Sequence, residues 1–413
     1  MRRPRFYYGW VIAVSAAISA AFVLGSAQFA LSAFLVPMQQ ELGWSRTAIF
    51  SALAVRYLVA GVLAPVIGPI ADQVRGPRIW FPVAAVLLGG ALAAIPLVDH
   101  PLWFLFWYGG VGAVGASMLT LNMWEAVLLK WFSRRRTRAL VIGAVGEASG
   151  PTVFPLLVTG LIAGAGWRGA WVWFGALTLA TLLPLTLALR TRPEQVGQHL
   201  DGDAAPAASP TPPAPGAAVR AESLTRREAM RHWSFWALAA TFTLSGVAIT
   251  GFQAQWIPYL VDEGFSPTIA AGAISVYGVS NISSRMLWGA LVARYPLRAL
   301  MAVHAVLAFI GIVALLTAVG SVPALFGWAA YQGLVLGSFF SLHTFIAADY
   351  FGRAHIGAIR GAMTMPAALA RAVGPVALSA LRDARGSYVA ALVLVLGVWA
   401  AKFGLTLSAR RPR

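Results

Sequence analysis

The sequence predicts an all-α membrane protein with twelve transmembrane helices in two six-helix bundles that repeat one another. Three observations predict this class. Of the 413 residues, 59% are hydrophobic and only 11% are charged, whereas about a quarter of a soluble domain is charged. Twelve runs are apolar over about the 20 residues that a helix needs to cross a bilayer. A segment rich in proline and alanine separates the first six runs from the last six.

The first bundle begins with an apolar run behind a basic arm, Met1 to Arg5. This arrangement is similar to a signal peptide, but the run continues to Pro37, far beyond the core of about 7–15 residues that a signal peptide has. We therefore interpret it as a retained first span. The six predicted spans cover residues 9–36, 47–71, 79–97, 103–129, 139–164 and 170–189.

The second bundle follows a predicted cytoplasmic linker at residues 191–231. Its centre, Ala204 to Gly216, has no apolar periodicity and cannot bury a core, so we expect a flexible segment. The predicted domains are therefore 1–190, the linker 191–231, and 232–413. The spans of the second domain cover residues 233–260, 268–292, 297–319, 323–348, 357–380 and 387–408.

The basic residues orient the chain. With both termini inside, the inner segments hold 24 Lys and Arg, Lys402 included, and the outer loops hold four, which are Arg46, Arg168, Arg382 and Arg385. This bias predicts a multi-pass protein of the bacterial inner membrane with both termini in the cytoplasm. The net charge of +17 is spread over short clusters between apolar runs, which argues against nucleic-acid binding. The absence of cysteine excludes disulfides and thiolate metal sites.

Three short motifs of the first half recur in the second half with nearly the same separation along the chain, which indicates an internal repeat. Gly68 and Gly289 open similar loops, and Trp131-Phe-Ser-Arg matches Tyr350-Phe-Gly-Arg. Gly150-Pro recurs as Gly374-Pro. Such pairs are also common at helix ends, but parallel halves are a known plan of transporters.

The loop after the second span carries Asp72, Arg75 and Arg78. The aspartate can pair with either arginine or with a helix end and latch the cytoplasmic face. This loop, Gly-x-x-x-Asp-x-x-Arg-Gly-x-Arg, resembles the signature loop of the major facilitator superfamily. The second copy has Ala293 where the aspartate would be, so we expect the latch to be stronger in the first half.

Further motifs resemble the oxalate:formate antiporter and monocarboxylate transporter branch of that superfamily. They are spread over nearly the whole chain: Glu41-Leu-Gly-Trp-Ser-Arg-Thr, Gly166-Trp-Arg, Arg192-Pro-Glu, Tyr350-Phe-Gly-Arg and Asp383-Ala-Arg-Gly-Ser-Tyr. The resemblance implies alternating access with small carboxylates as substrates.

Arg285 is the strongest candidate for binding such an anion. It precedes Arg294 by nine residues and so lies about 13 Å from the helix end, near the bilayer middle. Its guanidinium suits bidentate pairing with a carboxylate, and Asn281 lies one helical turn earlier. The monocarboxylate transporter family carries an arginine at this place, so the resemblance implies an anion-binding role for both residues. The alternative is an arginine in a permanent ion pair between helices.

Two further charged residues lie at membrane depth. Glu147 lies about 13 Å from the cytoplasmic end of span five, and we predict that it couples substrate or proton binding to transport by pairing reversibly with Arg285. A static interface pair is equally compatible. Arg371 lies about 16 Å deep in span eleven. The resemblance to oxalate:formate antiporters, which carry a cation there, makes it a second anion contact, unless it only lines water.

The remaining polar residues of the spans have weaker signals. Arg56 either steers anions or, as we prefer, snorkels to the outer interface. Glu125 is expected to pair near the inner end of span four, and His304 to lie at the periphery. Animal monocarboxylate transporters often use a lysine in span one, where this chain has only Gln28. That departure leaves anion exchange open beside proton symport. We also predict substrate contacts at Tyr331, His343 and Asn122.

The predicted function is secondary active transport of a small organic anion by a monomer. An efflux carrier for amphipathic drugs or siderophores is the alternative within transport, and a transport-inactive sensor is the alternative outside it. The sequence has no Walker loop, no His-Glu-x-x-His and no Gly-x-Ser-x-Gly, so neither an ATP-driven pump nor an enzyme is expected. The expected partners are the anion, protons and lipid, with no cofactor and no metal.

Overall fold

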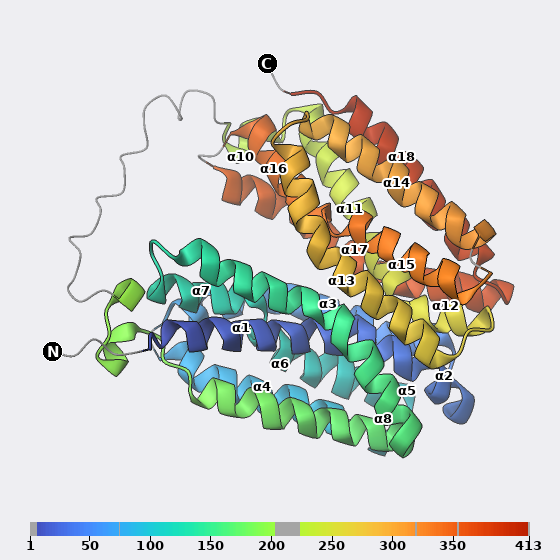
Figure 1. The fold of residues 1–413 in the computed structure, drawn as a ribbon, viewed down its shortest axis with the longest axis horizontal. Coiled ribbons are helices and arrows are strands. Elements are labelled where there is room, and N and C mark those ends of the chain that lie inside the picture. Colours follow the sequence, from blue (N-terminus) through green and yellow to red (C-terminus); the bar gives the residue numbers. More distant parts are fainter. Residues whose placement is uncertain (1–5, 74, 203–223, 319, 353–354, 412–413) are drawn as a thin grey trace. The chain divides into compact units, whose positions relative to one another are not determined.

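The computed structural model describes residues 6–73, 75–202, 224–318, 320–352 and 355–411. The chain forms two compact units, Met1–Pro210 and Thr211–Arg413, coloured blue to green and yellow to red in Figure 1. In the described part, nine helices are long and apolar enough to cross a membrane. One of these contains two spans, and α13 and α15 with α16 supply the other two, so the twelve predicted spans are confirmed.

In the first unit, short irregular turns divide two of the spans. Span one consists of α1, a π-helical turn η1 and α2, and span four also contains a π-helical turn, η3. Spans five and six form the continuous element α8, which bends at Gly166, whose φ is 68°. The elements are α1 (Gly9–Leu24), η1 (Gly25–Phe29), α2 (Ala30–Leu42), α3 (Arg46–Asp72), α4 (Gly76–Ala94), η2 (Ile95–Leu97), α5 (Pro101–Phe104), η3 (Leu105–Val111), α6 (Gly112–Met118), α7 (Leu121–Trp131), α8 (Arg136–Leu187), η4 (Pro193–Val196) and η5 (Leu200–Gly202).

The second unit begins with a short capped helix. In α10, the backbone N–H and hydroxyl of Thr225 donate to the Glu228 carboxylate, which lowers the pKa of Glu228. Figure 1 shows α14 and α18 running side by side in this unit. The elements are α10 (Arg226–Ala229), α11 (Trp233–Ala254), α12 (Trp256–Asp262), α13 (Pro267–Val292), α14 (Leu297–Ala318), α15 (Val322–Leu336), α16 (Phe339–Phe351), α17 (Ile356–Arg385) and α18 (Val389–Ser408).

The internal repeat extends to backbone conformation and helix caps. Gly43 ends α2 with a φ of 67°, and Gly264, at the matching place in the second half, has a φ of 91°. Shortly after these glycines, Ser45 and Ser266 cap α3 and α13, with their hydroxyls accepting from Ala48 N at 3.1 Å and from Ile269 N at 3.3 Å. A serine before the first helical residue satisfies an otherwise unpaired N–H. The two halves therefore turn at matched positions for the same chemical reason.

The repeated Gly-Pro pairs lie where helices approach closely. A Cβ on Gly374 of α17 would come within 2.7 Å of Val247 O on α11, and one on Gly150 of α8 within 3.3 Å of Ala21 O on α1. Small residues allow such backbone approach in membrane helices, where dispersion contacts drive association. The Gly-Pro motif is thus a packing device of both units.

An ion pair ties the end of each unit's first span to a later span. In the first unit, Glu41 pairs with Arg168 and also accepts from Trp167 Nε1 at 2.5 Å. In the second unit, Asp262 on α12 pairs with Arg382 on α17 at 3.0 Å. The two acids occupy matching positions, since each lies shortly before the glycine of positive φ in its own half. Glu41, Trp167 and Arg168 come from two of the sequence motifs quoted above, so these motifs meet as one contact.

The start of the predicted linker is held against the first unit. Asp201 is buried, and its carboxylate accepts from the backbone N–H groups of Arg134 at 2.9 Å and of Ser133 and Arg135 at 3.2 Å. These groups directly precede α8, so the carboxylate caps a long helix and complements its dipole. The remainder of the linker, 203–223, lies outside the described residues.

Replacing Asp201 is expected to lower the stability of the first unit. Its φ of 59° lies in the left-handed region, which disfavours alanine by about 1–2 kcal/mol. Loss of the cap costs about 0.5–2 kcal/mol more. We therefore expect Asp201→Ala to destabilise by about 2–3 kcal/mol, and Asp201→Gly, which has no left-handed penalty, by less. Unfolding monitored by tryptophan fluorescence would measure both, and unchanged stability in Asp201→Ala would contradict the capping role.

Candidate functional site

A ladder of polar side chains runs along α13 toward Arg285. Tyr277 is buried, and its hydroxyl accepts from Gln253 Nε2 of α11 at 2.6 Å and from Asn281 Nδ2 at 3.1 Å. Arg285 follows Asn281 by one helical turn and is partly buried. Residues four apart on a helix share a face, so the three side chains stand in a row. Tyr277 and Gln253 were not predicted from the sequence; the four-residue spacing of Tyr277 from Asn281 was the signal available.

Arg371 lies on α17 of the same unit and is partly buried. A Cβ on Gly246 of α11 would lie 3.8 Å from its Cγ, so the arginine stem runs along α11. The second unit therefore carries two partly buried arginines, Arg285 on α13 and Arg371 beside α11.

The other predicted contacts in this unit are engaged within the protein. The hydroxyl of Tyr331 donates to Leu307 O of α14 at 2.7 Å, which ties α15 to α14. His343 is buried, with Nδ1 2.9 Å from Phe339 O and Nε2 3.5 Å from Thr241 Oγ1. Their roles in substrate binding stay predictions.

Lys402 is not at the cytoplasmic end of the last span, where the charge count placed it. α18 continues to Ser408, and Lys402 is only 1% exposed. His304 is also fully buried, on α14, with Nδ1 3.1 Å from Lys402 Nζ. The positions predicted for Lys402 and His304 were wrong for the same reason. α14 and α18 pack against each other, and both side chains face the interface between these helices.

Arg56 in the first unit does not snorkel, so our preferred interpretation of it was wrong. Only 4% of its surface is exposed, because it continues the buried stripe of Ile49, Ala52 and Leu53 on α3. Nη2 donates to Ser26 Oγ at 2.9 Å, and the guanidinium carbon lies 5.1 Å from the centre of the Tyr108 ring. Nη1 is buried and has no hydrogen-bond partner among the described residues.

The surroundings of Arg56 come from the two π-helical turns. Ser26 lies in η1 and Tyr108 in η3. The Tyr108 hydroxyl donates to Ser26 O at 2.8 Å and to Ala27 O, so it joins the two turns. Gln28, the polar residue predicted for span one, accepts from the Tyr57 hydroxyl at 3.0 Å. Single π-helical turns are frequent at functional sites, and here two of them enclose a buried cation.

The other candidates in the first unit are less enclosed. Glu147 lies partly buried on α8, one residue after Gly146, where a side chain would collide with Ala17 of α1. Asn122 is exposed at the start of α7. Arg75 and Arg78 are exposed at the start of α4, and the side chain of Asp72 lies outside the described residues. The predicted latch therefore stays a prediction.

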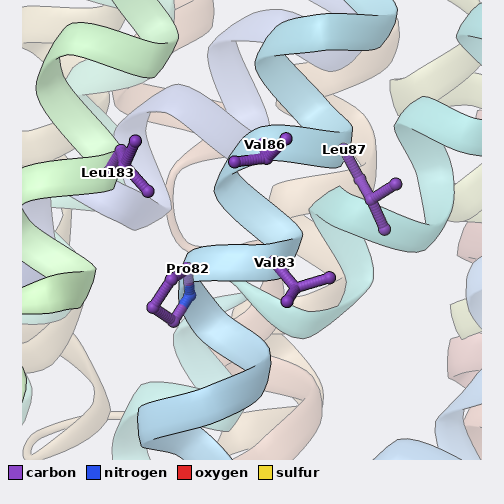
Figure 2. Close-up of a pocket in the computed structure, with 5 residues that line it drawn as sticks. All are labelled: Pro82, Val83, Val86, Leu87 and Leu183. Atoms are coloured by element: carbon purple, nitrogen blue, oxygen red, sulfur yellow. The ribbon is translucent and has the colours of Figure 1, made fainter.

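A surface pocket between α4 and α8 has a different character. Figure 2 shows the five residues that line it, and all are apolar: Pro82, Val83, Val86, Leu87 and Leu183. Such a surface can accommodate a lipid chain but offers no group that recognises an anion.

Comparison with known proteins places these features in a family. The profile of the Major Facilitator Superfamily matches residues 17–375. Human monocarboxylate transporter 11 is 27% identical, over 94% of this chain and 80% of its own length. Bovine monocarboxylate transporter 13 is 24% identical, over 94% of this chain and 86% of its length. The crystal structure of a bacterial homologue of the human lysosomal transporter Spinster, inward-facing and unoccupied, matches with a TM-score of 0.73 at 15% identity, covering 98% of this chain and 99% of that one.

Proposed function

Because the chain belongs to the Major Facilitator Superfamily, and is a membrane transporter rather than an enzyme, we propose that it carries a small organic anion of the monocarboxylate type by alternating access. The relatives named above, which are monocarboxylate transporters by name, support this substrate class. The transporter acts as a monomer in a bacterial inner membrane with both termini in the cytoplasm, a placement supported by the bias of basic residues, which is 23 to four once the buried Lys402 is left out.

The observation that carries the proposal is the ladder that ends at Arg285. The Tyr277 hydroxyl uses one N–H of the Asn281 amide and thereby fixes its orientation. The neighbouring guanidinium provides a planar fork that matches both oxygens of a carboxylate. An arginine at membrane depth is expensive and usually serves a pathway. Arg285 therefore anchors the carboxylate, and Asn281 contacts its oxygen or an adjacent hydroxyl.

Further cations make an anion the best fit among small solutes. Arg371 adds positive charge in the same unit. Arg56 supplies a buried guanidinium in the other unit, and its Nη1 donates no hydrogen bond to the described residues. Glu147 modulates the positive charge of the arginines. Tyr331, His343 and Asn122 shape the selectivity for the substrate. Asp72, Arg75 and Arg78 gate the cytoplasmic face. Efflux of cationic drugs would be better served by acidic residues at membrane depth.

Thermal unfolding of purified protein with a panel of mono- and dicarboxylates tests the substrate class. A ligand that binds only the folded state stabilises by RT ln(1 + [L]/Kd), about 2.7 kcal/mol at a hundred times Kd. We expect at least one small carboxylate to raise the unfolding temperature, and the corresponding amides, which lack the charge, to have no effect. If well-folded protein responds to no carboxylate but to amphipathic cations or siderophores, the efflux function replaces the one proposed.

A further inference from the structure

Lys402 lies buried among aromatic rings and histidines in the second unit. Its Nζ is 3.1 Å from His304 Nδ1, 5.0 Å from the centre of the Trp399 ring and 5.3 Å from that of Phe339. Among the described residues no carboxylate forms an ion pair with it. A buried ammonium without a carboxylate is unusual, because its loss of hydration costs several kcal/mol.

The two histidines belong to the same cluster from other helices. His304 packs its ring against Trp288 and Trp399, with centroid distances of 6.0 and 5.7 Å, and its Nε2 is buried without a hydrogen-bond partner among the described residues. His343 on α16 packs against Phe339 at 4.6 Å. Since Phe339 O can only accept, Nδ1 of His343 carries the hydrogen in their 2.9 Å contact.

Lys402 Nζ and His304 Nδ1 are close enough to share one proton, which can reside on either nitrogen. A charged Lys402 donates to the bare Nδ1 of His304, and a charged His304 donates from Nδ1 to a neutral Lys402. Two protonated groups 3.1 Å apart would repel in a medium of low dielectric constant. The faces of Trp399 and Phe339 stabilise the positive charge in part. The pair therefore titrates as a unit.

No other ionisable side chain of the described residues forms a hydrogen bond, ion pair or ring contact with Lys402 or His304, although α13, which packs Trp288 against His304, carries Arg285 three residues earlier. α14 contributes His304 and α16 contributes His343, while α11 presents Thr241 and Phe242. α17 places Ala367 against the same rings and carries Arg371 one turn further on, beside Gly246. The only charge that can enter or leave this cluster among the described residues is thus a proton on Lys402, His304 or His343.

We infer that Lys402 and His304 form a one-proton binding site, and that its occupancy couples anion transport to the proton gradient. The second part rests on the proposed transport function; the first does not. The site shares α11 with the anion ladder, since Thr241 faces His343 and Gln253 bonds Tyr277. A proton that alters the packing of α16 and α18 on α11 can therefore bias the conformation that binds the anion.

Nitrogen-15 NMR of the lysine side chains tests proton binding directly. The chain has only two lysines, Lys130 and Lys402, so Lys130→Arg, the matched control, leaves one signal in protein reconstituted in nanodiscs. We expect this signal to titrate within the pH range in which the protein stays folded, and its midpoint to move in His304→Gln. A signal that is constant throughout that range, or unaffected by His304→Gln, overturns the proton site without touching the transport function.

Transport in proteoliposomes tests the coupling, with the carboxylate found by thermal stabilisation as the probe and protein-free liposomes as the blank. With one proton per anion, a gradient of one pH unit gives about tenfold accumulation. In Lys402→Met, the side chain at this position cannot bind a proton. In Lys402→Arg, the side chain stays positively charged, because arginine does not lose its proton in proteins. We expect both to retain exchange of internal for external anion but to lose accumulation, which falls from about tenfold to onefold.

The result that overturns the coupling is accumulation by both variants equal to that of Lys130→Arg. Should Lys402→Met fail to fold, Lys402→Arg and His304→Gln carry the same comparison. If the wild type neither exchanges nor accumulates any carboxylate, the proposed function fails, whereas the NMR titration still decides the proton site.

Discussion

Arg285→Gln is expected to weaken the binding of carboxylates strongly, and to lower their uptake with it, while leaving the protein folded. A hydrogen bond to a charged group contributes about 1.5–3 kcal/mol, so removal of the guanidinium lowers affinity by about 10- to 100-fold. Glutamine keeps one donor and most of the length. The Tyr277–Asn281 bond does not involve Arg285, so the ladder itself should persist. Thermal shift and initial uptake rate, measured with the same acid, would show the loss.

Arg294→Gln is the matched control for this prediction. Arg294 is exposed just beyond the end of α13, so the same change of charge occurs on the same segment but outside the ladder. We expect it to bind and transport like the wild type. Equal losses in both variants would indicate a general effect of positive charge. Normal transport by Arg285→Gln would remove Arg285 from the anion site.

Arg56→Met is expected to lower uptake at least tenfold without lowering stability. Methionine fills a comparable volume without a charge, and a buried cation can be replaced by an apolar residue at little or no cost. The groups around Arg56 keep other partners, since Ser26 Oγ also donates to Val23 O at 3.2 Å and the Tyr108 hydroxyl keeps its bond to Ser26 O. A residue whose removal costs activity but not stability acts in function.

Arg46→Met is the control for Arg56→Met. It shows whether the loss of another buried arginine of α3 has the same effect on uptake and stability. Arg46 is equally buried, and its Nε donates to Gln39 Oε1 at 3.1 Å. Removing that donor takes a hydrogen bond from the partly buried Gln39 amide, which costs about 1 kcal/mol, so we expect lower thermal stability. The contrary outcome, an Arg56→Met protein that unfolds earlier but transports normally, would make Arg56 a structural residue.

Elements that depend on length and composition were predictable. Apolar runs of about 20 residues locate spans because an unpaired peptide group in lipid is too costly for any other conformation. The same reasoning located the break between α8's two spans near Gly166. The repeat was also predictable from motifs such as the Gly-Pro pairs at 150 and 374, because the close approach of helices needs a small residue at a fixed place in each half.

Which way a polar side chain faces was not predictable in the same way. Lys402 continues the buried stripe of α18, with Val395, Val398 and Trp399, and Arg56 continues that of α3. The periodicity was present in the sequence for both. It did not identify the buried face, because lipid-facing and protein-facing sides of a membrane helix are both apolar.

The sequence by itself determined the twelve spans, the twofold plan, the predicted orientation and Arg285 as a candidate anion anchor, since each follows from residue type and distance along the chain. Only the tertiary structure brought Gln253 to Tyr277, His304 to Lys402 and Ser26 to Arg56. These contacts join different helices, across 24, 98 and 30 residues of the chain respectively. Their existence depends on how each helix is rotated against its neighbours, and close packing of side chains fixes that rotation.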